Sequence, residues 1–454
     1  MRALLISTYD LGRQPLGLAS PAGRLRRAGV DVECVDTSRQ PLEDAQIAGA
    51  ALIAFYLPMH TATRLAGPLL DRVRQLNPDA TVVAYGLYAP LNRQWLNDRG
   101  VRHVLGPEDE AALAALACGA DGAGDEEGAP PGGRRAAGVR PDRSGLPPLA
   151  EYAALQMPDG TRRVAGSTDA TRGCKHLCRH CPIVPVYHGR FRAIAIHDVI
   201  ADVHAQVAQG AQHISFGDPD FLNGPTHARR LVEQLHDAFP SLTYDVTIKI
   251  SHLLQHRHLL PMLRETGCLF ITSAVESVDD AVLEKLRKGH TRKDFEQALT
   301  LCREAGVTLS PTFVAFTPWT TPGSYLDLLD AIRALDLVEQ VAPIQLAIRL
   351  LVTAESPLLE LDDVRAVVGS FDAGSLTWPW LHGDSVVDAL HRDVTRIVAA
   401  GASTPRADVF AAIAERACAL VGRPAPPPVK RRGVRPPMLT EPWYCCAEPV
   451  ESHL

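Results

Sequence analysis

The residues with the clearest chemical potential are three cysteines in the segment TRGCKHLCRHCP. Cys174, Cys178 and Cys181 have C-x3-C-x2-C spacing and follow a predicted strand. A loop of this length can wrap three thiolates around one face of an iron–sulfur cube. The fourth iron is then left without a protein ligand. The spacing therefore predicts a [4Fe–4S] cluster, with these three cysteines as its metal ligands and one coordination position open.

An open iron can be chelated by the amino and carboxylate groups of S-adenosylmethionine, and an electron from the cluster then cleaves the sulfonium. Side chains cannot do this chemistry alone, so the cofactors must carry it. A zinc site is one alternative, with His176, His180 or His188 as the fourth ligand that structural zinc requires. A ferredoxin-like electron carrier is the other.

Two runs of alternating strands and helices surround this loop. Residues 1–118 predict an α/β domain with a doubly wound, flavodoxin-like or Rossmann-like parallel sheet, because short apolar runs alternate with helical patterns. Residues 151–352 repeat the alternation over six further units, which predicts a partial (β/α)6 barrel. The chemistry of such folds lies at the carboxyl ends of the strands. We therefore expect the cysteine loop at one of these ends.

The remaining segments differ in composition. Residues 119–150 are rich in Gly, Ala, Pro, Asp and Arg without apolar periodicity, which predicts a flexible linker. Residues 353–422 predict a mainly helical C-terminal region. Residues 423–454 begin with a Pro-rich, basic arm that should be extended and mobile, and end in a short tail with two adjacent cysteines.

Composition restricts the class of partner. The chain has 454 residues and a formal net charge of -6, which disfavours chain-wide binding to nucleic acid or to an anionic membrane. No run of about 18 apolar residues predicts a transmembrane helix. The N-terminus reads as a strand and not as a signal peptide, so we expect a cytoplasmic protein. Ten cysteines in so long a chain favour metal or redox chemistry over a disulfide framework.

The triad, the repeated units and the motifs that follow resemble the radical S-adenosylmethionine (radical SAM) superfamily over residues 163–352. The resemblance implies that His180 packs on the adenine, where the superfamily usually has an aromatic residue. It implies that FGDPD supplies Gly217 and Asp218 to hold the cofactor's ammonium group, and that SAVES supplies Ser273 and Glu276 near its ribose. Each of these motifs also has a purely structural interpretation. His180 could be a surface histidine, DPD could form a turn, and Glu276 could be an acid at a helix N-terminus.

The tail and the first domain extend the resemblance. The sequence Cys445-Cys446-Ala-Glu-Pro resembles the CUAEP/CCAEP-tail radical SAM (seleno)protein family, in which Cys446 occupies a position that can be selenocysteine. This chain is then the all-cysteine homologue of a selenoprotein, and both thiols are candidate catalytic groups. A doubly wound domain before the barrel resembles cobalamin-binding radical enzymes. The cobalt-ligating motif Asp-x-His-x-x-Gly is absent, so cobalamin is an open expectation.

These inferences combine into one predicted activity. A radical SAM enzyme would cleave S-adenosylmethionine reductively and abstract hydrogen from a small-molecule or peptide substrate, with a flavodoxin or ferredoxin as its external electron donor. Cobalamin-dependent methylation and a rearrangement or thiol-assisted reaction are the two outcomes within this class. An iron–sulfur redox sensor or electron carrier is the alternative from another class.

Overall fold

The computed structural model describes residues 1–119, 140–427 and 436–441. Its first domain contains a five-stranded sheet with the order β2-β1-β3-β4-β5, and all of its strand pairs are parallel. This is the flavodoxin-like doubly wound order. The strands are β1 (Arg2–Ser7), β2 (Asp31–Asp36), β3 (Leu52–Tyr56), β4 (Thr81–Tyr85) and β5 (His103–Leu105).

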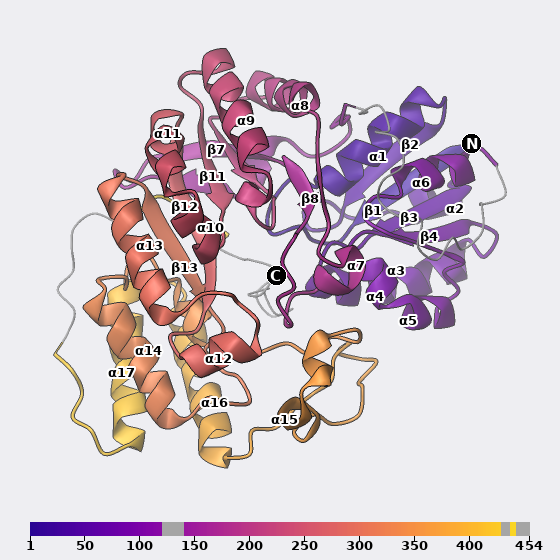
Figure 1. Cartoon of the computed structure of the whole chain (residues 1–454). Coiled ribbons are helices and arrows are strands. Elements are labelled where there is room, and N and C mark those ends of the chain that lie inside the picture. The colour runs from indigo at the N-terminus through magenta and orange to yellow at the C-terminus, as the bar shows by residue number, and fades with distance from the viewer. Residues whose placement is uncertain (120–139, 428–435, 442–454) are drawn as a thin grey trace.

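Both faces of this sheet are buried, as a parallel sheet requires. Successive residues of β1 point to opposite faces, so Leu4 joins the apolar cluster that includes α3, whereas Leu5 joins the cluster that includes α1 and α6. Figure 1 shows these helices around the sheet. The helices are α1 (Leu16–Arg27), α2 (Asp44–Ala48), α3 (His60–Leu76), α4 (Tyr88–Leu91), α5 (Arg93–Asp98) and α6 (Glu110–Ala117).

The second sheet has the order β13-β12-β11-β10-β7-β6-β14 and curls into a half-barrel. Its five central strands are parallel, and β6 and β14 add two antiparallel strands at one edge. The strands are β6 (Ala154–Gln156), β7 (Arg162–Thr168), β10 (His213–Phe216), β11 (Thr243–Thr247), β12 (Cys268–Glu276), β13 (Thr308–Phe313) and β14 (Met438–Leu439). A two-stranded ribbon of β8 (Thr171–Gly173) and β9 (Phe191–Ala193) lies beside it.

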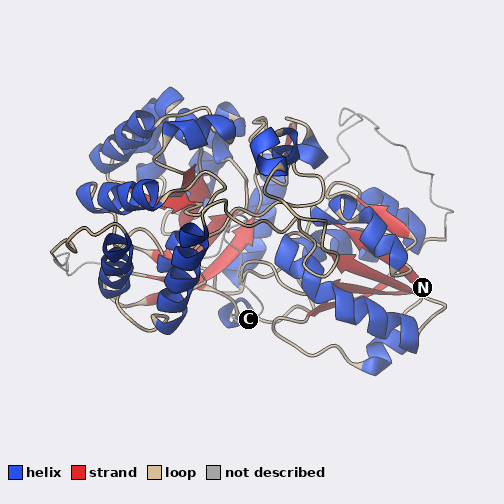
Figure 2. Cartoon of the chain, turned by 90° about the horizontal axis from the view of Figure 1, so that it is seen from below, coloured by secondary structure: helices blue, strands red, loops and turns tan. Residues whose placement is uncertain are grey.

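Helices cover the outer side of the half-barrel, so that in Figure 2 the strands of both sheets lie inside layers of helix. They are α8 (Ile196–Ala208), α9 (Pro225–Ala238), α10 (Ile250–Gln255), α11 (Leu260–Glu265), α12 (Asp280–Lys285), α13 (Arg292–Glu304) and α14 (Pro322–Ala334). The short α7 (Val184–Tyr187) lies beside α4 of the first domain instead. The C-terminal region adds α15 (Asp362–Arg365), α16 (Ser385–Ala400) and α17 (Arg406–Leu420). The predicted fold class is confirmed, because two α/β domains precede a helical extension.

The sixth barrel strand expected at residues 341–351 is wrong. Residues Pro343–Leu346 form a 3-10 helix, and only an isolated parallel bridge between Phe316 and Arg349 continues the sheet. Pro343 lacks the N–H group that a ladder needs, which accounts for the loss of pairing at the start of the run. Arg349 pairs with Asp388 at 2.8 Å and lies over the Trp380 ring, away from the other strand ends.

The predicted flexible linker is fixed in its described part, residues 140–150. Arg143 is buried and donates hydrogen bonds to Asp202 on α8 and to Gln14 of the first domain, at 2.9–3.0 Å. It also donates to the Ser167 carbonyl of β7 at 2.8 Å. One side chain therefore joins the two domains, which sequence composition could not indicate.

The described end of the C-terminal arm is also held in place. Strand β14 pairs with β6, and Glu441 accepts hydrogen bonds from Tyr9 at 3.0 Å and from Arg39 at 2.6 Å. The last described residue thus contacts the loop after β1. Within the described residues, no helix has the length and apolar character needed to cross a bilayer.

Candidate functional site

The two sheets direct the carboxyl ends of their strands into one shared cavity of about 330 Å³. Such a volume lies in the range of small-molecule sites. The first domain contributes residues that follow β1, β3, β4 and β5, and the half-barrel contributes residues that follow β7, β8, β10, β11 and β12. The cavity therefore lies where both folds place ligands.

The three predicted cluster ligands come together in this cavity. Cys174, Cys178 and Cys181 all line it, in the loop between β8 and α7. Structural zinc needs a fourth protein ligand, whereas a [4Fe–4S] cluster bound by three cysteines leaves one iron open. Three thiols at one cavity suit such a cluster.

Charge near the thiols supports the same assignment. Lys249, which follows β11, donates to Cys178 Sγ at 3.5 Å. Burial raises the pKa of Cys174 to about 11. An isolated Cys174 thiol would thus stay protonated at neutral pH, and bound iron would supply the positive charge that a thiolate needs. The donors present therefore fit a [4Fe–4S] cluster.

The predicted adenine and ribose residues form a connected pair. Glu276 Oε1 lies 3.0 Å from His180 Nε2 and accepts from Lys288 Nζ at 3.3 Å. Burial alone would raise the pKa of Glu276, but the charges of Lys288 and His180 lower it to about 2. Glu276 Oε2 and His180 Nδ1 are buried without a hydrogen-bond partner among the described residues, and both side chains line the cavity. These two atoms are free to bind a ligand.

A backbone irregularity aims Glu276 into the cavity. The register between β12 and β13 shifts between Ala274 and Glu276, and Glu276 has a φ of 70°. Such a left-handed conformation costs a non-glycine residue about 1–3 kcal/mol and concentrates at functional sites. The contacts with His180 and Lys288 offset that cost.

The FGDPD motif reaches the cavity, but its first carboxylate has a different task from the predicted one. Asp218 accepts from the Ala170 and Thr171 amides and from the Thr171 hydroxyl, at 2.6–2.8 Å. Burial raises its pKa to about 7. Its carboxylate fixes the backbone that leads into β8 and the cysteine loop. Gly217 lines the cavity, and a Cβ there would lie 2.4 Å from Asp169 Oδ1, so only glycine fits.

Ser273 lies away from the cavity, in contrast to its predicted place at the strand mouth. Side chains of a strand alternate between two faces, so Thr272, Ala274 and Glu276 line the cavity. Ser273 shares the other face with Ile271, which is part of the main apolar core, and is fully buried. The structure therefore does not bring Ser273 to the same place as Glu276 and His180.

The first domain forms a closed, aromatic wall of the cavity. The Tyr56 and Tyr85 rings lie 5.5 Å apart at the ends of β3 and β4, and the Tyr85 hydroxyl donates to the Gly17 carbonyl at 2.7 Å. Arg172 of the half-barrel crosses to this wall and pairs with Glu110 at 3.0 Å. This pair is a second charged contact between the two domains, in addition to the hydrogen bond from Arg143 to Gln14.

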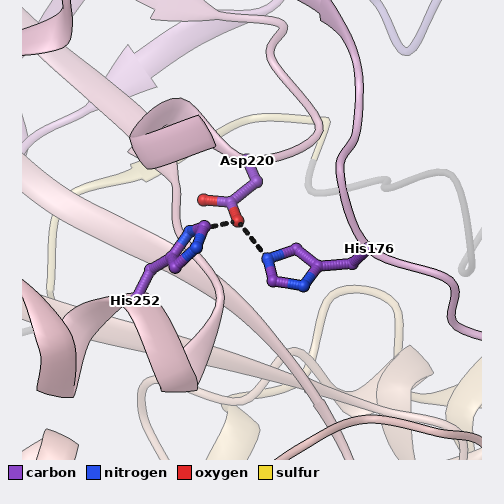
Figure 3. Close-up of side chains that lie close together, drawn as sticks. All are labelled: His176, Asp220 and His252. Atoms are coloured by element: carbon purple, nitrogen blue, oxygen red, sulfur yellow. Dashed lines mark ion pairs between the residues drawn. The ribbon is translucent and has the colours of Figure 1, made fainter. Parts of the chain in front are cut away.

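Sequence reasoning missed a second polar group at the strand ends. His176, Asp220 and His252 point toward one another beside the cysteine loop (Figure 3). Burial alone would raise the pKa of Asp220, but the two imidazoles lower it to about 2. The DPD sequence reads as a turn, and only the fold brings His252 to it. The predicted catalytic thiols, Cys445 and Cys446, lie outside the described residues.

Residues 169–335 match the family model described as the Radical SAM superfamily. The match begins five residues before the first cysteine of the triad and covers the strands from β8 to β13. It therefore contains every predicted cofactor-binding residue of the half-barrel.

Two solved structures share the architecture. The cobalamin-dependent S-adenosylmethionine radical enzyme OxsB, with aqua-cobalamin bound, has a TM-score of 0.66 and 13% identity, over 88% of this chain and 67% of that one. The radical S-adenosylmethionine methyltransferase TsrM from Kitasatospora setae, with cobalamin and a [4Fe–4S] cluster bound, has a TM-score of 0.57 and 21% identity, over 74% and 70%. At these identities the likeness shows the fold alone.

Two curated relatives match in sequence. The tRNA-2-methylthio-N(6)-dimethylallyladenosine synthase of Desulfosudis oleivorans is 27% identical over 203 residues, 40% of each chain. The ribosomal protein uS12 methylthiotransferase RimO of Desulfotalea psychrophila is 25% identical over 175 residues, 36% of this chain and 39% of that one. The chain spans about two fifths of their length. The first relative is named for a tRNA nucleoside, so these comparisons do not support the prediction that the chain has no nucleic-acid partner. The chain therefore carries a radical SAM superfamily domain over residues 169–335.

Proposed function

We propose that this enzyme cleaves S-adenosylmethionine reductively and uses the product to abstract hydrogen from a small-molecule or peptide substrate. One observation carries the proposal: three thiols and the unpartnered polar atoms of His180 and Glu276 face the same cavity. A [4Fe–4S] cluster with S-adenosylmethionine bound would supply the electron and the 5′-deoxyadenosyl radical.

The chain's own residues have four tasks in this proposal. Cys174, Cys178 and Cys181 hold the cluster, and Lys249 offsets the charge of the Cys178 sulfur. Glu276 Oε2 accepts hydrogen bonds from ribose hydroxyls, and His180 stacks on the adenine while Glu276 fixes its ring. Asp218 acts as a positioning residue through its hydrogen bonds to Ala170 and Thr171. Tyr56 and Tyr85 give the cavity an aromatic wall on the side of the first domain.

The test is anaerobic reconstitution with iron and sulfide, followed by dithionite reduction with S-adenosylmethionine and an assay of 5′-deoxyadenosine. Wild type should form it, and Cys178→Ala should form none. Cys302→Ala is a matched control, because Cys302 is a buried cysteine of α13 outside the cavity. A wild-type protein with a full cluster and no 5′-deoxyadenosine would favour the electron carrier or redox sensor. An external flavodoxin or ferredoxin would replace dithionite in the cell.

We further propose that cobalamin binds between the sheets without a histidine from the first domain on its cobalt. The observation that favours it is the wall itself: strand ends of both domains face one cavity, and Tyr56 and Tyr85 offer flat apolar surfaces to a macrocycle. Among the described residues, no histidine of the first domain lines the cavity, and His60 Nε2 lies 2.7 Å from the Ser375 carbonyl.

Cobalt content after loading with hydroxocobalamin tests this proposal. Retained cobalt is the expected result, with the same Co(II) electron paramagnetic resonance spectrum in His60→Gln as in wild type. Absence of retained cobalt, or a changed spectrum in His60→Gln, would contradict the proposal. Methylation would follow only from the first outcome, whereas a thiol-assisted reaction or rearrangement is compatible with both.

We also propose that the tail of the CUAEP/CCAEP-tail family acts at this cavity through Cys445 and Cys446. Glu441 is fixed by Tyr9 and Arg39, beside the loop that lines the cavity with Asp10 and Arg13. A chain covers at most about 3.6 Å per residue. The four residues from Glu441 to Cys445 can therefore span at most roughly 14 Å.

A disulfide-trapping experiment tests the reach of these thiols. Mild oxidation of Leu11→Cys should give a disulfide to Cys445 or Cys446, read by mass spectrometry of the digest. Leu76→Cys is the control, because Leu76 is exposed at the far end of α3. Equal yields of disulfide in both variants, or no disulfide in Leu11→Cys, would show that the tail does not act at this cavity.

A further inference from the structure

A second group of metal-ligating side chains lies beside the cysteine loop. His176 belongs to that loop, Asp220 caps the 3-10 helix Phe221–Asn223 that follows β10, and His252 lies on α10 after β11. Asp220 Oδ2 is 2.6 Å from His252 Nδ1 and 3.4 Å from His176 Nε2. All three atoms lie within 4.8 Å of one another, and Figure 3 shows them converging from three segments.

These atoms are buried and lack ordinary partners. Asp220 and His252 are 1% and 2% exposed. Among the described residues, Asp220 Oδ2, His252 Nδ1 and His176 Nε2 have no hydrogen-bond partner of acceptable geometry. A buried polar atom left in this state costs about 1–3 kcal/mol. Three of them aimed at one point offer a site for a common partner.

The carboxylate is held in the orientation that such a partner needs. Asp220 Oδ1 accepts from the Leu222 amide at 3.2 Å, so the other oxygen stays directed at the two imidazoles. The three donors come from separate elements that the half-barrel already fixes, which preorganises the group. His176 and Asp220 also line the cavity, so the group opens toward it.

We propose that His176, Asp220 and His252 bind a divalent transition metal ion of the zinc or ferrous type. Two imidazoles and one carboxylate are a donor set that suits these ions, and three protein ligands leave a coordination position for a ligand oxygen. The ion is distinct from the cluster, since no cysteine belongs to the group. It ties the segment between Cys174 and Cys178 to β10 and β11, and its open position faces the cavity.

Zinc is the probe for the first experiment, on full-length protein with its cluster reconstituted. After equilibration with zinc and desalting, wild type should retain about one zinc per chain beside about four iron atoms. X-ray absorption at the zinc edge should show nitrogen and oxygen at about 2.0–2.2 Å and no sulfur at about 2.3 Å. A sulfur shell, or no retained zinc, would overturn the proposal.

Variants separate this site from the cluster. His252→Ala and Asp220→Asn should each lower retained zinc at least tenfold and leave iron unchanged. His256→Ala is the matched control, because His256 lies on the same helix end, with its ring 5.7 Å from that of His252, outside the group. A variant with all three cluster cysteines changed to Ala should lose iron and keep zinc. Zinc loss in that variant, or an equal loss in His256→Ala, would contradict the assignment.

Thermal melting distinguishes loss of metal from loss of fold. Zinc should raise the Tm of wild type and of His256→Ala, since an ion that binds only the folded state stabilises it. It should leave the Tm of Asp220→Asn unchanged. An equal rise in Asp220→Asn would show that zinc binds elsewhere.

Discussion

The two parallel sheets meet at one cavity but present different strand ends to it. In the half-barrel, polar atoms of His180, Glu276 and Asp220 are buried without hydrogen-bond partners. In the first domain, the Tyr85 hydroxyl is bonded to Gly17, and Tyr56 packs against it. Burial of such atoms is costly unless a partner binds them. At these positions the half-barrel offers unpartnered polar atoms to the cavity, whereas the two tyrosines of the first domain offer it aromatic surface.

This difference between the two sheets predicts separate effects of mutations on protein stability and on ligand affinity. Changes in the half-barrel strand ends should alter ligand binding more than folding. Changes in the first domain, and in the residues that join it to the half-barrel, should alter folding and leave S-adenosylmethionine binding almost unchanged.

Arg143→Ala should have the largest effect. It removes the side chain that joins the domains and leaves Asp202, which is 1% exposed, as an unpaired buried charge. Breaking such a pair costs about 3–5 kcal/mol of unfolding free energy. Urea titration followed by tryptophan fluorescence measures it. Arg229→Ala, which breaks an exposed pair with Glu233, should cost under about 1 kcal/mol. Equal losses would mean that Arg143 does not join the domains energetically.

Glu276→Gln should weaken S-adenosylmethionine binding about tenfold to a hundredfold, because a hydrogen bond to a charged group contributes about 1.5–3 kcal/mol. Anaerobic calorimetry with cluster-loaded protein gives the dissociation constant. Glu284→Gln, at an exposed site of α12, is the control. An unchanged dissociation constant would show that Glu276 does not bind the ribose.

His60, on α3 of the first domain, gives a pH dependence of stability. Burial lowers the pKa of His60 from 6.5 to about 4, so the folded state binds fewer protons than the unfolded state between these values. Stability is therefore full above pH 6.5 and falls as pH drops toward 4. Between pH 7 and pH 5, wild type should lose about 1–2 kcal/mol more than His60→Gln. Equal losses in urea titrations at both pH values would contradict this.

Tyr85→Phe should have the smallest effect. Loss of one hydrogen bond to the Gly17 carbonyl should reduce unfolding free energy by about 1 kcal/mol. The affinity for S-adenosylmethionine should stay the same. A clear loss of affinity would show that the aromatic wall contacts the cofactor, and would narrow the contrast between the two sheets.

Periodicity predicted both sheets and the edge at which they carry chemistry, because parallel strands are nearly continuous apolar runs. It placed the cysteine loop and Glu276 at strand ends. It failed at Pro343, where a missing N–H prevents a sixth strand. It also placed Ser273 at the cavity. Side chains along β12 alternate between the two faces of the sheet, so a shift of one residue moves a side chain to the opposite face.

Contacts between loops that are distant in the sequence could not be predicted from the sequence. Asp218 reads as a ligand for the cofactor, but the fold presents the Ala170 and Thr171 amides to it. His252 lies 32 residues beyond Asp220 and meets it only because β10 and β11 are neighbours. Such convergence depends on strand order and helix orientation, which local patterns do not encode.

The anchoring of Glu441 has a consequence for the order of events during synthesis. Tyr9 precedes Glu441 by 432 positions, and Arg39 precedes it by 402. At a translation rate of about 5–20 residues per second, the first domain waits roughly 20–90 s for this contact. Strand β14 joins β6 at the same late moment. The contact of Glu441 with the first domain therefore forms only after the half-barrel has been synthesised.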